Sequence, residues 1–112
     1  MKREPGSPFD NAESLVTAAA AVRRAFAQQA LPDDLTPIAA QALLAVDLNE
    51  EASVSDLHEL LAITQPATSR ALKALETDGY VVSKPAASDR RIRLYRATAR
   101  GSAWVRTFEK SL

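Results

Sequence analysis

Cysteine is absent from this 112-residue chain, and histidine occurs once, as His58. Without cysteine there is no disulfide, no thiolate-bound zinc and no cysteine redox switch. A single histidine argues against a histidine-based metal or catalytic cluster. No paired carboxylates, glycine-rich phosphate loop or Ser/His/Asp set has a suitable spacing. The sequence therefore predicts neither an enzyme nor a metal site, and we expect no cofactor.

Long apolar runs are also missing. The longest apolar stretch, residues 15–22, is mostly alanine and is followed by Arg23 and Arg24. A membrane-spanning helix needs about 20 apolar residues. The first eleven residues include two acidic residues and two prolines, which does not fit the basic start of a signal peptide. We therefore expect no contact with a membrane and a location in the reducing cytoplasm.

A formal excess of either charge is absent, because 14 basic residues balance 14 acidic ones. The charges are nevertheless unevenly distributed. Residues 53–112 hold 10 Lys and Arg against 6 Asp and Glu, a net charge of +4, and between Thr64 and Arg106 the count is 9 to 3, or +6. Uneven surface charge is common, but a localised cationic face can also displace counterions from nucleic-acid phosphates. Charge by itself leaves both interpretations open.

The periodicity of the remaining sequence predicts a fold that is mainly α with a small β-hairpin. Residues 1–9 are predicted as a disordered tail and residues 10–112 as a single domain. The expected order is α-α-α-α-β-β-α, which is a winged helix-turn-helix. The helices are expected at residues 10–29, after the N-caps Thr36, Ser55 and Thr64, and after Thr98, and the strands at residues 80–84 and 91–97.

Two short helices joined by a short turn, followed by a charged hairpin loop, form a pattern with chemical meaning. A helix fits the major groove of DNA, about 12 Å wide, and a hairpin loop can reach the adjacent minor groove. On the second of these helices, Gln65 can pair with adenine, and Arg70 with guanine or a phosphate. Thr64 and Ser69 can donate hydrogen bonds to phosphates. An ordinary amphipathic surface helix shows the same pattern, so this helix alone does not establish DNA binding.

Residues 53–105 as a whole resemble the core of the MarR (multiple antibiotic resistance regulator) family. Residues 56–70, DLHELLAITQPATSR, are similar to the helix-turn-helix of that family, and residues 71–82, ALKALETDGYVV, to the segment that runs into its first wing strand. SDRR at residues 88–91 resembles the Asp-Arg-Arg signature of the wing tip. ATARG at residues 97–101 is similar to the Leu-Thr-x-x-Gly motif before the dimerisation helix. The order and spacing of these segments make the resemblance specific.

The resemblance implies a bacterial, homodimeric transcription regulator, such as a repressor, that binds specific sequences of double-stranded DNA. The helix over residues 65–77 would lie in the major groove, and the wing, residues 84–92, in the minor groove. Asp89 is expected to accept from an arginine and hold the wing, or to bond its own backbone. Because many family members release DNA when they bind small, often phenolic, ligands, a small-molecule effector is left open as a partner. The residues predicted to contact DNA are Thr64, Gln65, Pro66, Ala67, Ser69, Arg70, Lys73, Lys84, Arg90, Arg91 and Arg93.

Residues 10–30 and 98–112 are expected to form dimerisation helices beside a DNA-binding lobe over residues 36–97. The chain departs from the family pattern in four places. Ala62 stands where the turn usually has glycine, Thr68 occupies a core-facing position that is usually apolar, and Ala97 replaces a usual leucine. The chain also ends at Leu112, which implies a shortened last helix. A role in the core is the first expectation for the two aromatic residues of the last helix. The residues predicted for the dimer interface are Leu15, Val22, Phe26, Trp104, Phe108 and Leu112.

Two other functions stay open at this point. Winged-helix domains also serve as protein–protein adaptors, and plasmid replication or maintenance factors use the same fold on DNA. An adaptor would bury the surface of the helix over residues 65–77 against a protein partner and would have no affinity for DNA.

Overall fold

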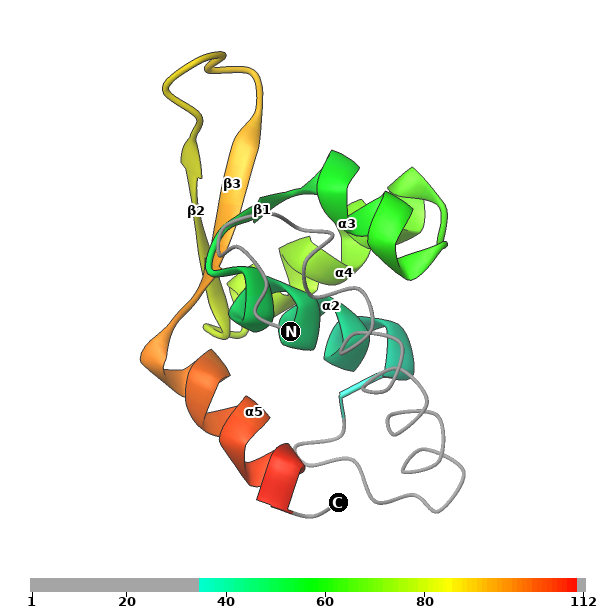
Figure 1. The fold of residues 1–112 in the computed structure, drawn as a ribbon, viewed down its shortest axis with the longest axis vertical. Helices are drawn as coiled ribbons and strands as arrows, with labels where there is room; N and C mark the ends of the chain where they lie inside the picture. Colours follow the sequence, from blue (N-terminus) through cyan, green and yellow to red (C-terminus); the bar gives the residue numbers. More distant parts are fainter. Residues whose placement is uncertain (1–34, 111–112) are drawn as a thin grey trace, which may run out of the picture.

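The computed structural model describes residues 35–110, which form four helices and a three-stranded antiparallel sheet. The strand order is β1-β3-β2. Strands β2 and β3, with the loop over residues 86–92, form a hairpin that projects from the helices (Figure 1). This hairpin contains the predicted wing residues 84–92, and from here on the whole hairpin is called the wing. In chain order the elements are α2 (Pro37–Asn49), β1 (Ala52–Ser53), α3 (Val54–Leu61), α4 (Gln65–Thr77), β2 (Val81–Pro85), β3 (Arg93–Ala97) and α5 (Ala99–Lys110).

The predicted fold class, mainly α with a winged helix-turn-helix, is confirmed. The tail and first helix predicted for residues 1–30 lie outside the described residues. Within residues 35–110 no helix is both long and apolar enough to cross a bilayer.

Helices α2 and α4 begin with the same local chemistry. Oγ1 of Thr36 accepts a hydrogen bond from the backbone N–H of Ala39 at 3.1 Å, and Oγ1 of Thr64 accepts one from Ala67 at 3.2 Å. Each threonine thereby satisfies one of the N–H groups that have no partner in the first helical turn. A proline follows each threonine within two positions, where its missing N–H costs nothing. Both helix starts agree with the sequence prediction.

The predicted start of α3 at Ser55 is wrong. The N-cap is Ser53, whose Oγ accepts from the backbone N–H of Asp56 at 3.1 Å, while Oδ2 of Asp56 accepts from the N–H of Ser53 at 3.3 Å. These reciprocal bonds form a capping box and satisfy two amide groups together. Ser55 instead lies exposed in the first turn of the helix.

The sheet differs from the predicted hairpin in three respects. Strand β2 covers Val81–Pro85 rather than residues 80–84. Strand β1 was not predicted: Ala52 pairs with Tyr95 and Ser53 with Leu94. A two-residue strand is too short to show an alternating pattern, so only its partner β3 reveals it. In addition, β3 begins at Arg93 rather than at residue 91, because the chain at Ile92 still belongs to the loop, where its N–H donates to the carbonyl of Asp89 at 3.0 Å.

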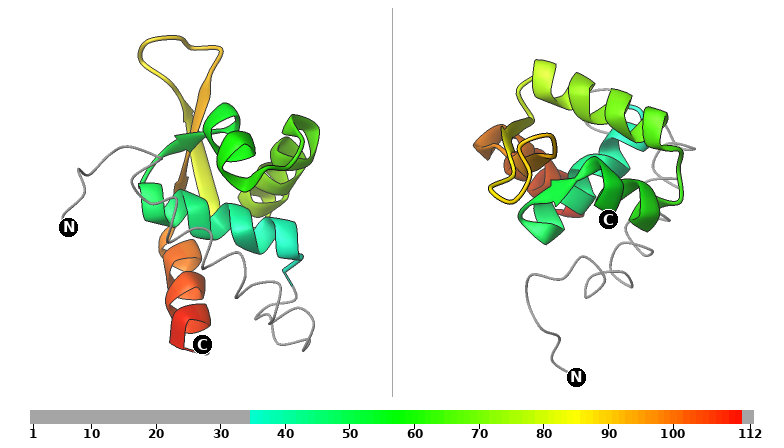
Figure 2. Two further views of the ribbon diagram at one scale, coloured as in Figure 1. Left: turned by 45° about the vertical axis from the view of Figure 1, so that its right-hand side comes forward. Right: turned by 90° about the horizontal axis from the view of Figure 1, so that it is seen from above.

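Helix α2 is the centre of the core. Seven of its 13 residues are buried, and it packs against α3, α4, α5 and β3 (Figure 2). Burial of a large aliphatic side chain contributes roughly 1.5–3 kcal/mol. Because one buried helix supports all these elements, the same core positions both α4 and the wing. The largest fully buried side chains are Leu43, Val46, Leu57, Thr68, Leu72, Leu75, Val81, Val105 and Phe108.

Helix α5 joins the rest of the fold through a close backbone approach at Gly101. Oγ1 of Thr98 donates to the carbonyl of Gly79 at 2.7 Å and accepts from the N–H of Gly101 at 3.1 Å. The N–H of Thr98 donates to the carbonyl of Tyr80 at 3.0 Å. A Cβ atom on Gly101 would overlap that Tyr80 carbonyl oxygen and lie 3.1 Å from Cδ1 of Leu43. Glycine is therefore required here for steric reasons.

The substitution Gly101→Ala is expected to destabilise the fold by about 1–3 kcal/mol, because the added methyl group must displace backbone atoms. At an unhindered helical position the same substitution raises stability by roughly 1 kcal/mol through helix propensity. A loss of stability therefore indicates that the backbone of Gly101 lies against the Tyr80 carbonyl. Urea unfolding followed by circular dichroism measures the effect. Thr107→Ala, on the exposed side of α5, is the control and should leave stability nearly unchanged. Equal or higher stability of Gly101→Ala would contradict the close approach.

The turn between α3 and α4 is made by a left-handed alanine. Ala62 has φ 55° and ψ 39°, a conformation that glycine adopts without strain. Without glycine, the turn could avoid a left-handed residue or accept strain, and Ala62 adopts the strained left-handed conformation. Across the turn, Nδ1 of His58 lies 3.1 Å from the carbonyl oxygen of Ile63.

Replacing Ala62 by glycine should stabilise the protein by about 1 kcal/mol, because a left-handed backbone costs an L-residue about that much. The matched control is Ala103→Gly, the same change at an exposed position inside α5, which should lose about 1 kcal/mol. Both values come from denaturant midpoints. If the two substitutions shift stability in the same direction, Ala62 is not strained.

Candidate nucleic-acid interface

Helix α4 places its apolar side in the core and its polar side in solvent. Ala71, Leu72 and Leu75 are buried, and Thr68 is fully buried, with Oγ1 donating to the carbonyl of Thr64 at 2.9 Å. The hydroxyl of Thr68 is thus satisfied inside the protein. Ala67 is half-buried. The remaining predicted contact residues of this helix and its N-cap are exposed, namely Thr64, Gln65, Pro66, Ser69, Arg70 and Lys73.

The tip of the wing is held by an ion pair between Asp89 and Arg91. Nε and Nη2 of Arg91 donate to Oδ1 and Oδ2 of Asp89 at 3.1 and 2.9 Å, and the backbone N–H of Arg91 donates to Oδ1 at 3.0 Å. The side-chain hydrogen bond, followed by the backbone one, lowers the pKa of Asp89 below its ordinary value. Asp89 therefore makes both expected contacts, one to an arginine and one to the backbone of its own turn.

The four other basic residues of the wing differ in their contacts. Nζ of Lys84 lies 3.2 Å from Oε2 of Glu51, and Arg93 donates to the hydroxyl of Ser83 from Nε at 3.1 Å and from Nη2 at 3.0 Å. Arg90 is exposed, and among residues 35–110 it has no ion pair or side-chain hydrogen bond. Arg96, on β3, is likewise exposed without such a contact among these residues. Arg90 is therefore the cation of the wing loop that is available to a partner.

An open groove of about 380 Å³ lies between the helix-turn-helix and the wing. Sequence reasoning missed several of its residues because they come from β1, the start of α3 and the inner face of β3. The Ser-x-x-Asp spacing of the capping box is the sequence signal that places the start of α3. The residues that line the groove are Ser53, Val54, Ser55, Gln65, Ser69, Arg91, Ile92, Arg93 and Tyr95.

Tyr95 is the most buried side chain at this groove that carries a titratable group. Burial raises its pKa, the negative charge of Glu76 raises it further, and the positive charge of Arg93 opposes the increase. The phenol therefore stays neutral at physiological pH and keeps its hydroxyl hydrogen.

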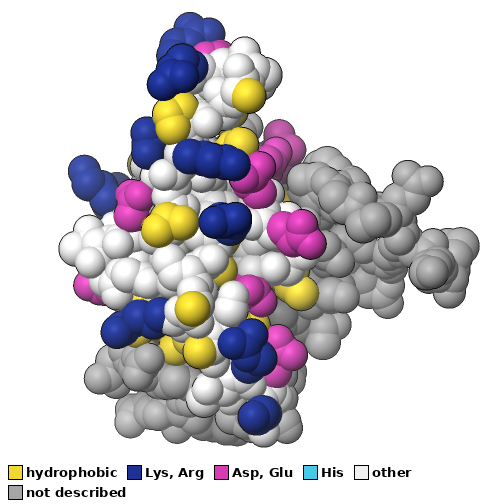
Figure 3. Space-filling view, turned by 90° about the vertical axis from the view of Figure 1, so that its left-hand side faces the viewer, with side chains coloured by type: hydrophobic (Ala, Val, Ile, Leu, Met, Phe, Trp, Pro, Cys, Tyr) yellow, Lys and Arg dark blue, Asp and Glu magenta, His cyan; other side chains and the backbone are white. Residues whose placement is uncertain are grey.

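Positive charge gathers on the wing. In Figure 3, Lys and Arg side chains predominate at the tip of the hairpin, whereas its base and the lower part of the same face carry both signs of charge. The net charge of zero for the whole chain thus conceals a cationic projection.

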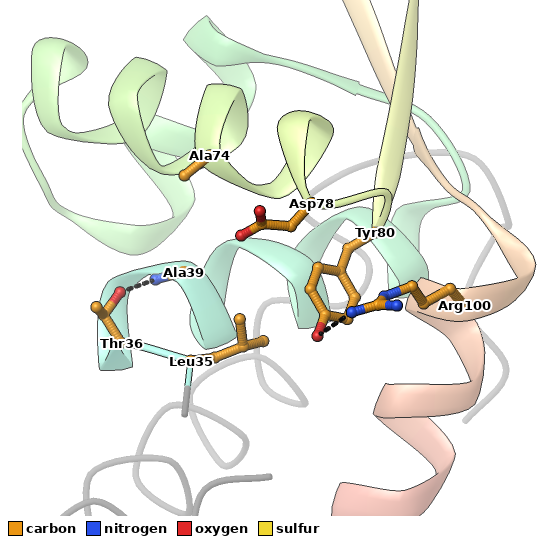
Figure 4. A pocket seen from close by; sticks show the side chains of 7 residues that line it. All are labelled: Leu35, Thr36, Ala39, Ala74, Asp78, Tyr80 and Arg100. Atoms are coloured by element: carbon orange, nitrogen blue, oxygen red, sulfur yellow. Dashed lines mark hydrogen bonds between the residues drawn. The ribbon is translucent and has the colours of Figure 1, made fainter. Parts of the chain in front are cut away.

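A second hollow, of about 500 Å³, lies away from the groove, between the start of α2, the end of α4 and the start of α5 (Figure 4). The guanidinium of Arg100 lies over the ring of Tyr80, 4.5 Å from its centroid, and Nη2 donates to the Tyr80 hydroxyl at 3.1 Å. Asp78 brings an acidic group to the same hollow. In the described part of the chain, no three His, Asp or Glu side chains are grouped so that they could hold a metal ion.

The residues predicted for a dimer interface are only partly described. Leu15, Val22, Phe26 and Leu112 lie outside the described residues. The other two, Trp104 and Phe108, are 3% and 1% exposed, and their rings stack with centroids 5.4 Å apart. This burial fits the core role that was the first expectation for them, and their role in a dimer stays a prediction.

Comparison with known proteins identifies relatives of this fold. The sequence profile of the MarR family matches residues 33–92. Among solved structures, a mutant of MarR from E. coli complexed with operator DNA has a TM-score of 0.69 and 19% identity, covering 88% of this chain and 68% of that one. A transcriptional regulator of Thermotoga maritima has a TM-score of 0.67 and 20% identity, with coverages of 88% and 66%. The regulator BldR of Sulfolobus solfataricus has a TM-score of 0.67 and 22% identity, with coverages of 93% and 78%.

At these identities the likeness to solved structures concerns the fold. The chain spans about two thirds of the length of the first two of these structures. A comparison with curated protein sequences gives no significant match.

The ion pair at the wing tip predicts a measurable titration. The carboxyl of Asp89 should titrate with a midpoint below its ordinary value of 3.8, because Arg91 stabilises the charged form. Since the pKa is lowered in the folded protein, the pair should be intact above pH 3.8 and be lost as the pH falls through the lowered value. NMR of the side-chain carboxyl carbon measures the midpoint. Arg91→Ala should raise the midpoint toward the ordinary value, although the backbone hydrogen bond to Asp89 remains. An unchanged midpoint in that variant would exclude the ion pair in solution.

Proposed function

Because the chain belongs to the MarR family, whose profile covers residues 33–92, we propose that it is a DNA-binding transcription regulator. Helix α4 binds in the major groove of double-stranded DNA, and the wing binds in the adjacent minor groove. The observation that carries this proposal is the groove in which Gln65 and Ser69 of α4 face Arg91 and Arg93 of the wing.

The dimensions of DNA explain why such a groove supports the proposal. A helix in the major groove and a hairpin in the neighbouring minor groove must straddle the phosphate backbone that separates them. The groove between α4 and the wing is lined by the hydroxyl groups of Ser55 and Ser69 and by the cation of Arg93. Hydroxyl donors and arginines are the groups that contact phosphates in protein–DNA complexes.

The proposed contacts follow from exposure and charge. Gln65 and Arg70 contact base edges, because both are exposed on α4 and can bond bases bidentately. Thr64, Ser69 and Lys73 contact phosphates, and Pro66 and Ala67 supply apolar surface beside them. Arg90 enters the minor groove, while Asp89 holds Arg91 and with it the shape of the tip.

We further propose that the protein is a homodimer that acts as a repressor. A dimer presents two copies of α4 to half-sites about one helical turn apart. Residues 10–30 and α5 form its interface. The E. coli MarR mutant with a similar fold is complexed with operator DNA, and this supports binding to an operator here.

Binding to duplex DNA at several salt concentrations tests the proposal. The probe is a duplex that the protein selects from a random-sequence library, and affinity is measured by fluorescence anisotropy. The logarithm of the affinity should fall linearly with the logarithm of the salt concentration, with a slope of about −0.9 for each phosphate neutralised. Failure to bind or select any duplex at low salt would exclude the proposed function.

The substitution Arg70→Ala should weaken binding to the selected duplex by about 1–3 kcal/mol if Arg70 contacts a base, and should relax specificity at that position. Arg106→Ala, which removes the same charge from the exposed side of α5, is the control. Anisotropy titrations of both variants give the comparison. Equal losses in the two variants would show that Arg70 contributes only net charge.

A further inference from the structure

A chain of hydrogen bonds links α4 to the two strands of the wing. The hydroxyl of Ser83 on β2 donates to Oε2 of Glu76, in the last turn of α4, at 2.7 Å. The same hydroxyl oxygen accepts from Nε of Arg93 at 3.1 Å and from Nη2 at 3.0 Å. Nη2 also lies 3.3 Å from the carbonyl oxygen of Ser83. We call this chain the Glu76–Ser83–Arg93 relay.

Ser83 fits the relay because a hydroxyl group has one hydrogen to donate and two lone pairs to accept with. The hydrogen goes to the carboxylate, and the oxygen receives the guanidinium. Both bonds involve a charged partner, and such bonds are shorter and roughly twice as strong as bonds between neutral groups. Alanine at this position would leave no group to bridge the Glu76 carboxylate and the Arg93 guanidinium.

The relay lies where the projecting wing joins the body of the fold. The wing projects from the body, and its loop is the part farthest from α5 (Figures 1 and 2). β1 supports one edge of β3 through two residue pairs. Within residues 35–110, the bond from Ser83 to Glu76 is the side-chain hydrogen bond that joins α4 to the strands of the wing. Of the two charged residues of the relay, Arg93 also lines the groove between α4 and the wing.

We propose that the Glu76–Ser83–Arg93 relay is a positioning device that sets the wing at a fixed distance from α4. This inference rests on the proposed function. With the relay intact, Arg90 reaches the minor groove while α4 lies in the major groove, so both contacts are made on one DNA site. Without it, the wing moves relative to α4, and the contact of Arg90 no longer adds to that of the helix. Ser83 is therefore a positioning residue and does not itself contact DNA.

A double-mutant cycle tests the relay. Arg90→Ala is combined with Ser83→Ala, and affinities are measured for the selected duplex with A·T-rich flanks and for the same duplex with G·C-rich flanks. In the protein with Ser83, Arg90→Ala should weaken binding chiefly on A·T-rich flanks, where a narrow minor groove attracts arginine. In the Ser83→Ala protein this effect should shrink by at least about twofold, the lower end of couplings within one network.

Three further variants separate positioning from a loss of folding. Ser88→Ala is the same substitution on an exposed serine of the wing loop and should leave the effect of Arg90→Ala unchanged. Ser83→Thr keeps the hydroxyl and should restore the full effect of Arg90→Ala on binding. Glu76→Gln removes the charge to which Ser83 donates and should reduce the effect of Arg90→Ala. This variant tests the relay by a second route if Ser83→Ala unfolds. Circular dichroism confirms folding in each case.

The outcomes distinguish a failure of the proposed DNA binding from a failure of the proposed relay. If the unsubstituted protein binds no duplex, the proposed function fails and the inference fails with it. If it binds DNA but Arg90→Ala has the same effect with and without Ser83, only the relay is excluded. If Arg90→Ala has no effect on either flank in the unsubstituted protein, the wing makes no contact for the relay to position, and the inference is overturned as well.

Discussion

The contact between Gly101 and the carbonyl oxygen of Tyr80 is the constraint on which the rest of the structure depends. Tyr80 lies between the end of α4 and the start of β2, and its carbonyl also accepts from the N–H of Thr98 at the end of β3. This carbonyl, in the short link between α4 and β2, thus contacts the end of β3 and the start of α5. Because Gly101 has no Cβ atom, α5 can lie against this link without displacing its backbone.

Hydrogen bonds and ion pairs divide five of the basic residues of α4 and the wing into two groups. Lys84, Arg91 and Arg93 are held by partners within the described residues, whereas Arg90 and Arg70 project into solvent. The sequence did not show which of these five residues have partners, since all of them lie in the same segment of net positive charge. The partners of the first group shape the wing, and in the proposed function the second group contacts DNA.

Much of the fold follows from local chemistry. The starts of α2 and α4 were predictable, because Thr36 and Thr64 bond to N–H groups only three residues away. The glycine-stopped end of α4 and the outward face of that helix were predictable for the same reason, since a helix fixes which residues share a side. The start of α3 was predictable in principle from the spacing of Ser53 and Asp56, although the prediction chose Ser55.

The sequence by itself determined the winged helix-turn-helix, the apolar and polar sides of α4 and the charged wing tip, because these depend on neighbours a few residues apart. Only the tertiary structure decided the pairing of β1 with β3, the strained conformation of Ala62 and the bridging role of Ser83 between Glu76 and Arg93. These features join residues distant in the chain, or depend on how α3 and α4 pack. Their partners are chosen by the shared core around α2, which no short stretch of sequence contains.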